Sequence, residues 1–246
     1  MSAPIYVYGL HAVLELLRQR PEDALELFVQ SGRDDERLSE ISDLAKESGV
    51  SVQPASRARL SELCEATAHQ GAVVRARPLN LKNESDLFEL IESGKDLLIL
   101  DSITDPHNLG ACIRTAAAMG LGGVIFAKDK SADLTPAAIK VAAGACELID
   151  LVRVTNLVRA IETLQSEGVL VVGTSLSPEA SRLQDFDFSG QSALVMGSEG
   201  AGLRRLTAER CDGLGYIPLT GSVQSLNVSV ATGMGLYELM RQKSAG

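Results

Sequence analysis

Residues 97–120, LLILDSITDPHNLGACIRTAAAMG, contain the pattern that decides the fold of this chain. The apolar run at 97–100 has the composition of a buried strand, and a polar stretch follows it directly. Asp105 and Pro106 begin a helix, because aspartate caps free backbone amides and proline's fixed φ suits the first helical position. Gly120 ends this helix. The stretch therefore predicts a strand, a polar loop and a helix in succession.

The same alternation continues toward the C-terminus. Apolar runs lie at 97–100, 123–127, 150–154, 169–174, 193–197 and 214–219, with helical patterns between them. This alternation predicts an α/β fold with a mostly parallel sheet that is covered by helices. Ligands of such sheets bind beyond the carboxyl ends of the strands, so we expect functional residues after Leu100, Met196 and Pro218.

The N-terminal part of the chain has a second, smaller α/β pattern. Helical patterns at 10–19, 35–48 and 60–66 accompany apolar runs at 25–29, 50–52 and 72–76. Residues 79–96 are polar and acidic, which is typical of a linker. The sequence therefore predicts a small domain at 1–78, a linker at 79–96 and a larger domain at 97–246.

Composition and charge limit the classes of function. The 246 residues are 45% hydrophobic and 22% charged, as in an ordinary globular protein. No apolar run approaches the roughly 20 residues that span a bilayer, and the N-terminus lacks the charge order of a secretory signal. We therefore expect a cytoplasmic protein with no membrane partner. The four cysteines have no metal-ligand spacing, so we expect no metal.

The net charge of −9 argues against a protein that coats nucleic acid nonspecifically. A local basic face remains compatible with it. Arg57 with Arg59, and Arg75 with Arg77, have a two-residue spacing that places each pair on one side of a strand. The alternative for each pair is a solvated surface position.

Two further polar loops follow predicted strands. In LVMGSEGAGL, residues 194–203, the glycines have the order G-x-x-G-x-G, which differs from the dinucleotide fingerprint, and no phosphate-loop lysine follows. Glu199 in this turn would repel phosphate but tolerate a neutral or cationic adenosine derivative. Ser225, Asn227 and Ser229 lie where the last helix should start, with Ser225 as the expected cap. A site is thus predicted where the three loops meet.

Together these stretches closely resemble the three motifs of the SpoU-type RNA ribose 2'-O-methyltransferases of the SPOUT superfamily. The matching segments are DPHNLGACIRTA (105–116), LVMGSEGAGL (194–203) and IPLTGSVQSLNVSVA (217–231). YGLHAVLELLR (8–18) and HQGAVVRARP (69–78) also look like the N-terminal RNA-binding domain of bacterial 23S rRNA guanosine-2'-O-methyltransferases. The resemblance covers essentially the whole chain.

The resemblance implies a C-terminal trefoil knot in the parallel sheet, an N-terminal domain like ribosomal protein L30e, and a homodimer. It implies methylation of a ribose 2'-hydroxyl in ribosomal RNA, 23S rRNA in particular, with S-adenosylmethionine as cofactor. Main-chain groups of Gly197, Ile217 and Leu226 would hold this cofactor. The catalytic set would be Asn108, Arg114, Glu199, Ser225 and Asn227. The RNA-binding set would be Arg57, Arg59, His69, Arg75 and Arg77.

Arg114 is the catalytic candidate of this family, but its chemistry admits two roles. A guanidinium pKa above about 12 makes proton abstraction demanding. We favour a cation that contacts the 2'-oxygen or the adjacent phosphate and stabilises developing negative charge. Six residues separate Asn108 from Arg114, so on a helix they point about 120° apart and serve different partners.

Three alternatives remain open. Within the resembling family, tRNA is the competing substrate, because no residue of the motifs identifies the modified base. A noncatalytic RNA-binding or ribosome-assembly protein could keep the same scaffold. A nucleotide-dependent oxidoreductase is disfavoured by the order of the glycines and the absence of an acidic ribose partner.

Overall fold

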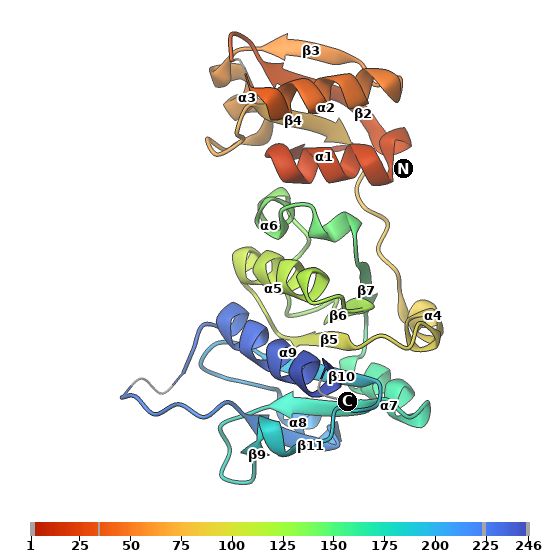
Figure 1. The fold of residues 1–246 in the computed structure, drawn as a ribbon, viewed down its shortest axis with the longest axis vertical. Helices are drawn as coiled ribbons and strands as arrows, with labels where there is room; N and C mark the ends of the chain where they lie inside the picture. Colours follow the sequence, from red (N-terminus) through yellow and green to blue (C-terminus); the bar gives the residue numbers. More distant parts are fainter. Residues whose placement is uncertain (1–2, 34, 223–224, 245–246) are drawn as a thin grey trace. The chain divides into compact units, whose positions relative to one another are not determined.

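The structure is a computed structural model in which residues 3–33, 35–222 and 225–244 are described. Contacts between Cα atoms divide the chain into two compact units, which are drawn in Figure 1. The first unit contains the chain up to Asn80 together with Leu134–Leu148, and the second contains Leu81–Asp133 and the chain from Ile149 onward. A short segment from the middle of the sequence thus packs with the N-terminal residues.

The first unit is built on a four-stranded sheet in the order β1-β4-β2-β3. Its strands are β1 (Ile5–Tyr8), β2 (Ala24–Gln30), β3 (Val52–Ala55) and β4 (Ala72–Ala76). β4 is antiparallel to both of its neighbours, whereas β2 and β3 are parallel. The helices are α1 (Leu10–Gln19), α2 (Glu36–Glu47), α3 (Arg57–Cys64) and α6 (Pro136–Ala142), and a 3-10 turn follows at Ala145–Glu147.

The sequence prediction of this unit is correct for some elements and wrong for others. The expected helix at 10–19 and strand at 72–76 are present with those bounds, but the strand Ile5–Tyr8 was not expected. The third helix begins at Arg57, earlier than expected, because Ser56 caps it by accepting a hydrogen bond from Arg59 N. Arg57 and Arg59 therefore lie about 200° apart on a helix, and the expectation that they share one side of a strand is wrong.

The second unit is built on a seven-stranded, entirely parallel sheet in the order β7-β6-β5-β10-β8-β11-β9. Its strands are β5 (Leu97–Asp101), β6 (Gly123–Ala127), β7 (Asp150–Val154), β8 (Leu170–Thr174), β9 (Ser181–Arg182), β10 (Ser192–Gly197) and β11 (Gly213–Tyr216). The helices are α4 (Leu87–Glu92), α5 (Pro106–Ala118), α7 (Leu157–Ser166), α8 (Arg205–Arg210) and α9 (Val228–Ser244). The prediction of a parallel α/β sheet is confirmed.

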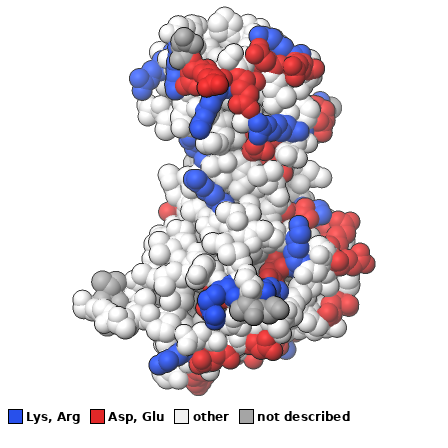
Figure 2. Space-filling model, viewed as in Figure 1, with Lys and Arg blue, Asp and Glu red and all other residues white. Residues whose placement is uncertain are grey.

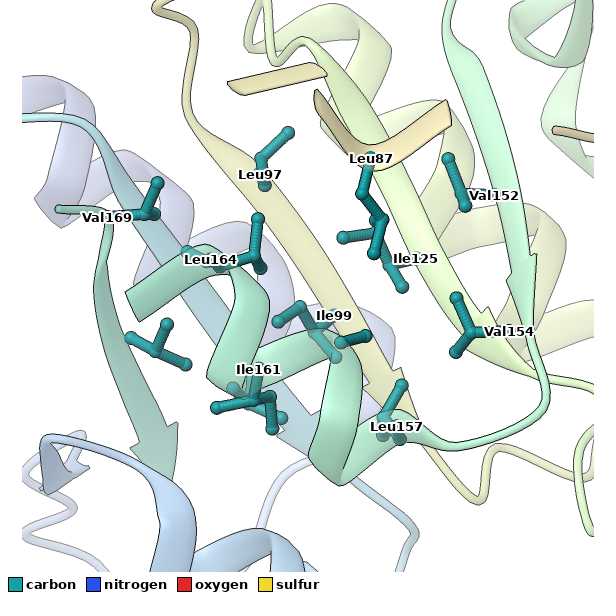
Figure 3. Close-up of a cluster of buried hydrophobic side chains, with 14 of the residues drawn as sticks. Leu87, Leu97, Ile99, Ile125, Val152, Val154, Leu157, Ile161, Leu164 and Val169 are labelled. Carbon is teal, nitrogen blue, oxygen red and sulfur yellow. The ribbon is translucent and has the colours of Figure 1, made fainter. Parts of the chain in front are cut away.

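Helices cover both faces of this sheet. On one face α4 and α7 pack on β5, β6 and β7, and their leucines and isoleucines form the buried cluster of Figure 3. On the other face α5 and α9 pack together, and α9 approaches β10 so closely that a Cβ on Gly235 would lie 2.6 Å from Leu194. Leu87 and Leu90 are buried in the first cluster, so part of the expected linker packs in the second unit.

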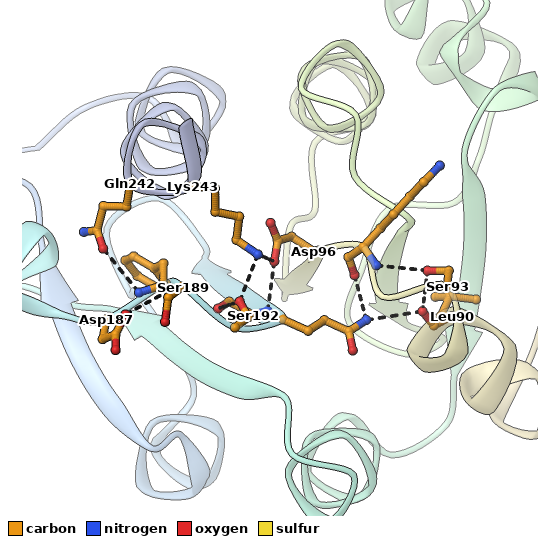
Figure 4. A network of polar contacts seen from close by, with 12 residues as sticks. Leu90, Ser93, Asp96, Asp187, Ser189, Ser192, Gln242 and Lys243 are labelled. Atoms are coloured by element: carbon orange, nitrogen blue, oxygen red, sulfur yellow. Dashed lines mark hydrogen bonds and ion pairs between the residues drawn. The ribbon is translucent and has the colours of Figure 1, made fainter. Parts of the chain in front are cut away.

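Polar contacts hold the C-terminal end of α9 against the amino ends of β5 and β10 (Figure 4). Lys243 Nζ donates to Asp96 Oδ1 at 2.7 Å and to the carbonyl of Gly190 at 2.8 Å. Asp96 Oδ1 also accepts from the backbone amide of Ser192 at 2.9 Å. The last helix is therefore held at its far end, while its first turn lies at the carboxyl edge of the strands.

Two negative findings concern the described part of the chain. It contains no helix long and apolar enough to cross a membrane. It also contains no group of three or more histidine, cysteine or acidic side chains placed to hold a metal ion.

Candidate active site

A pocket of about 550 Å³ opens at the carboxyl edge of the parallel sheet of the second unit. Its walls come from the ends of β8, β10 and β11 and from the residues that precede and begin α9. The volume is in the range of small-molecule and cofactor sites. Segments that follow three different strands thus meet at the edge of the sheet where the alternation of strands and helices predicted a site.

Glycines allow the loop after β10 to fold back over the end of its own strand. A Cβ on Gly197 would lie 2.3 Å from the carbonyl carbon of Gly202, so no larger residue fits there. Gly200 and Gly202 have φ values of 79° and 67°, which favour glycine. Ser198 and Gly202 exchange two backbone hydrogen bonds, at 3.1 and 2.9 Å. The resulting hairpin presents Glu199 at its tip.

Glu199 joins the three polar loops. Asn108 Nδ2 donates to Glu199 Oε1 at 3.0 Å, and Asn227 Nδ2 donates to the same oxygen. Asn227 Nδ2 also lies 3.0 Å from Asn108 Oδ1, and Val228 N lies 3.3 Å from Glu199 Oε1. Several N–H groups thus converge on one carboxylate oxygen, which orients both amide side chains beside the pocket.

The beginning of each helix at the site has its own cap. Asp105 Oδ1 accepts from His107 N at 2.9 Å, as the sequence predicts. For the last helix the expected cap was Ser225, and this is wrong. The helix begins at Val228, and it is Asn227 Oδ1 that accepts from Ser229 N at 2.9 Å. Asn227 therefore uses its amide oxygen for the helix and its amide nitrogen for Glu199.

The structure brings most of the predicted site residues together. Five of them line the pocket, namely Gly197, Glu199, Ile217, Ser225 and Leu226. Asn108 and Asn227 are joined to the pocket through Glu199. Arg114 is different, because its side chain is exposed on α5, away from the pocket lining. Among the described residues it has no hydrogen-bond or ion-pair partner.

Part of the pocket was missed at the sequence level. Thr174, Ser175, Leu176 and Ser177, at the end of β8, form one of its walls. Thr174 Oγ1 donates to the carbonyl of Val195 at 2.9 Å, which ties this wall to β10. The signal was available, since β8 was predicted and its carboxyl end lies at the same edge as the others.

The charges in the pocket indicate which ligands it accepts. Among the described residues, Glu199 is the only charged side chain of the lining, and no lysine or arginine is present there. Such a lining disfavours a phosphate group and favours a neutral or positively charged ligand. The sulfonium group of S-adenosylmethionine carries a positive charge, so the residues present fit this cofactor.

The residues expected to bind RNA lie in the first unit and differ in their availability. Arg59 Nη1 lies 2.7 Å from Glu62, and Arg77 Nη1 lies 3.3 Å from Asp23. Arg57 has no ion-pair partner among the described residues, and Arg75 is half-buried with its Nε unpartnered. Figure 2 shows basic and acidic side chains interspersed on the visible face of this unit.

His69 is almost entirely inside the first unit. Its side chain is 2% exposed, and its Nδ1 accepts a hydrogen bond from Gly71 N at 3.1 Å. Burial lowers the pKa of His69, and the positive charges of Arg57 and Arg33 act in the same direction. The buried ring shapes the turn before β4 through this hydrogen bond and exposes almost no surface to RNA.

Two family models match the chain. The SpoU rRNA methylase family matches residues 96–237, and the RNA 2'-O ribose methyltransferase substrate-binding family matches residues 6–82. The first covers more than half of the chain and contains the whole pocket. The second covers most of the first unit, including the five residues expected to bind RNA.

Curated relatives extend the similarity over the full length. The chain is 51% identical over 246 residues to the 23S rRNA (guanosine-2'-O-)-methyltransferase RlmB of Acinetobacter baylyi, covering 99% of each chain. It is 48% identical over 240 residues to the enzyme of the same name from Escherichia coli, covering 97% of this chain and 98% of the relative.

A solved structure extends the likeness to the fold. The AdoMet-bound rRNA methyltransferase from Sinorhizobium meliloti superposes with a TM-score of 0.76 at 25% identity, covering 97% of this chain and 87% of that one.

Proposed function

Because the chain belongs to the SpoU rRNA methylase family, we propose that it transfers a methyl group from S-adenosylmethionine to a ribose 2'-hydroxyl of RNA. The substrate is a guanosine of 23S rRNA, as in the names of its relatives. The observation that carries the proposal is the pocket in which Glu199, the one charged side chain among the described lining residues, is bonded to Asn108 and Asn227. It supplies a place for a cationic donor beside oriented amide groups.

Different residues of the site would bind the cofactor and position the ribose. Main-chain groups of Gly197, Ile217 and Leu226 would hold the cofactor, which would supply an activated methyl group. Asn108, Ser225 and Asn227 would orient the ribose toward the donor. Alignment is the main requirement of this reaction, because orientation alone lowers the barrier strongly. Glu199 keeps the amides in place, and its carboxylate would favour a positively charged donor.

Arg114 would contact the 2'-oxygen or the adjacent phosphate and stabilise the negative charge that develops there as the hydroxyl proton passes to solvent water. A guanidinium at this position favours the oxyanion electrostatically and need not lose a proton itself. Arg114 is exposed on α5, outside the pocket lining, and has no partner among the described residues, so this role requires bound RNA to extend from the pocket to α5.

We also propose that the protein works as a homodimer through α5 and α9. Val230, Met234 and Tyr237 of α9 are exposed by 51%, 44% and 56% and recur at helical spacing along one stripe. Figure 2 shows few charged side chains over α5 and α9. An apolar stripe of this kind fits a second copy of the chain. Met234→Glu would then yield monomers in light-scattering chromatography.

The proposal includes the finer features of the fold. The C-terminal part of the second unit threads into a trefoil knot, and the strand order β5-β10-β8-β11 together with the packing of α9 on α5 supports this. The substrate-binding domain at 1–78 is L30e-like and contacts RNA in the cytoplasm, with 79–96 as the connection to the catalytic domain at 97–246. No metal takes part in the reaction.

A transfer assay with labelled methyl donor tests the activity. Unmodified 23S rRNA should become labelled on a ribose, and mass spectrometry of nuclease fragments should locate a 2'-O-methylguanosine. Glu199→Gln should reduce kcat/KM by about a hundredfold, because misplacement of the aligning groups costs this much. Glu209→Gln, which alters only an exposed ion pair with Arg205, should be unchanged.

The same assay separates the alternatives. Labelling of tRNA but not of rRNA would overturn the proposed substrate. RNA binding without any transfer would support the noncatalytic protein, and reduction of a nicotinamide cofactor would support the oxidoreductase.

A further inference from the structure

Asp101 is a buried charge that the proposed reaction does not use. It ends β5, its side chain is 0% exposed, and it lies opposite Gly197 in the parallel register of β5 and β10. Removing a carboxylate from water is energetically costly, and an apolar residue in such a place is often at least as stable. A buried aspartate at the rim of the site therefore needs an explanation beyond stability.

Two contacts of the Asp101 side chain go to Arg204, at the end of the loop that forms the pocket, and a third goes to the adjacent Ser102. Oδ2 accepts from the backbone amide of Arg204 at 2.9 Å, and Oδ1 pairs with the Arg204 guanidinium at 2.5 Å. Ser102 Oγ donates to Oδ1 at 3.0 Å, and Ser102 adopts a φ of 63°, in the left-handed region. A serine in this conformation is strained, so the local backbone is shaped around the carboxylate.

Two sets of contacts therefore hold together the two ends of the loop between Gly197 and Arg204. On one side Gly197 lies against the backbone of Gly202, and on the other Asp101 holds both the amide and the side chain of Arg204. In this closed arrangement Glu199, at the tip of the loop, contacts Asn108 and Asn227.

We propose that Asp101 is a positioning residue that acts through Arg204 to hold the glycine loop in the shape that binds the methyl donor. This inference rests on the proposed function, since it assigns a cause to the affinity of the proposed cofactor site. Asp101 touches neither the pocket nor the reacting atoms. Substitution of Asp101 should therefore change the affinity for the cofactor and the order of the loop, and it should leave the affinity for RNA unchanged.

The experiment compares Asp101→Asn with a matched control at a second buried carboxylate, Glu147→Gln. Glu147 is 4% exposed in its side chain and pairs with Arg20 in the first unit, far in sequence from the pocket loops. Calorimetry should show that Asp101→Asn weakens S-adenosylmethionine binding about tenfold, the value of one charge-assisted hydrogen bond. The KM for this donor should rise by the same factor, while kcat at saturation stays within about twofold. Glu147→Gln should lower the melting temperature and leave donor affinity unchanged.

Arg204→Gln provides a second variant that should fold readily, because the Arg204 side chain is 40% exposed. It removes the guanidinium contact but keeps the backbone amide bond, so it should weaken donor binding less than Asp101→Asn. The double variant should be no weaker than Asp101→Asn alone. Full additivity of the two effects would overturn the proposed connection.

Amide hydrogen exchange tests the inference without any ligand. Asp101→Asn should accelerate exchange at 198–204, and Glu147→Gln should not. Unchanged exchange in this segment, or unchanged donor affinity with only a lower melting temperature, would overturn the role of Asp101. Failure of the wild-type protein to bind the donor would instead contradict the proposed function, and the exchange result would still decide whether Asp101 orders the loop.

Discussion

The two units of this chain use buried carboxylate–arginine pairs in different ways. In the first unit Glu147 receives two hydrogen bonds from Arg20, at 2.8 and 3.0 Å, and the pair joins a mid-chain segment to the N-terminal residues. In the second unit Asp101 holds a glycine loop at the edge of a pocket. The same chemistry therefore stabilises a fold in one place and shapes a binding site in the other.

The sheets explain the difference. The strands of the first unit run in both directions, so their loops leave from both ends of the sheet. All strands of the second unit are parallel, so their carboxyl ends meet at one edge. Backbone groups and polar side chains accumulate at that edge, and a buried charge there acts on a site.

The largest expected effect is at Gly197. Gly197→Ala places a Cβ 2.3 Å from the Gly202 carbonyl carbon, and the loop must move to relieve the clash. We expect donor binding to fall below detection in calorimetry and methyl transfer to be lost. RNA binding by gel shift should remain. Normal donor affinity in this variant would contradict the close approach of the loop.

Removing the carboxylate of the first unit should affect stability only. Glu147→Ala leaves Arg20 buried without its main partner, and breaking a buried pair costs about 3–5 kcal/mol. The melting temperature in calorimetry should fall accordingly, while donor affinity at a temperature below the transition should equal that of the wild type. A loss of donor affinity at that temperature would show that the two pairs do not have separate roles.

A smaller effect is expected from the arginines of the first unit. Arg57→Gln and Arg75→Gln should weaken RNA binding and reduce its dependence on salt. The slope of the logarithm of the binding constant against the logarithm of the salt concentration should become less steep by about 0.7–0.9 for each phosphate that is no longer neutralised. Arg59→Gln and Arg77→Gln should change binding less, because these side chains already have acidic neighbours. Binding measured over a series of salt concentrations checks this order, and four equal effects would contradict it.

The smallest effect concerns the thiols. Burial raises the pKa of Cys112 to about 11, and of Cys146 and Cys211 to about 12. Since only the thiolate reacts, iodoacetamide at neutral pH should modify half-buried Cys64 first, and the rates should rise with pH. In Glu147→Ala, Cys146 should become reactive while Cys112 does not. Peptide mass spectrometry follows each site separately.

The sequence predicted much of the second unit because its signals are local. Apolar runs, the Asp105-Pro106 helix start and the glycines of the hairpin each act within a few residues. Asn108, Glu199 and Asn227 were expected at one site, and they are in mutual contact. The wall at Thr174–Ser177 was missed although its strand was predicted.

The first unit was harder to predict. Its strand at Ile5–Tyr8 is short, and its third helix begins earlier than the apolar pattern suggests. The packing of Leu134–Leu148 with the N-terminal residues depends on contacts such as Arg20 with Glu147, which are 127 residues apart. No local pattern encodes a contact of this kind.

The sequence by itself determined the parallel α/β architecture and the motifs of the methylase family, because strand periodicity, helix caps and glycine order are properties of neighbouring residues. Only the tertiary structure decided that Glu199 joins both asparagines, that His69 is buried, that Arg114 lies outside the pocket, and that Asp101 closes the loop. Each of these depends on which side chains meet across strands and loops, and that is set by packing rather than by proximity along the chain.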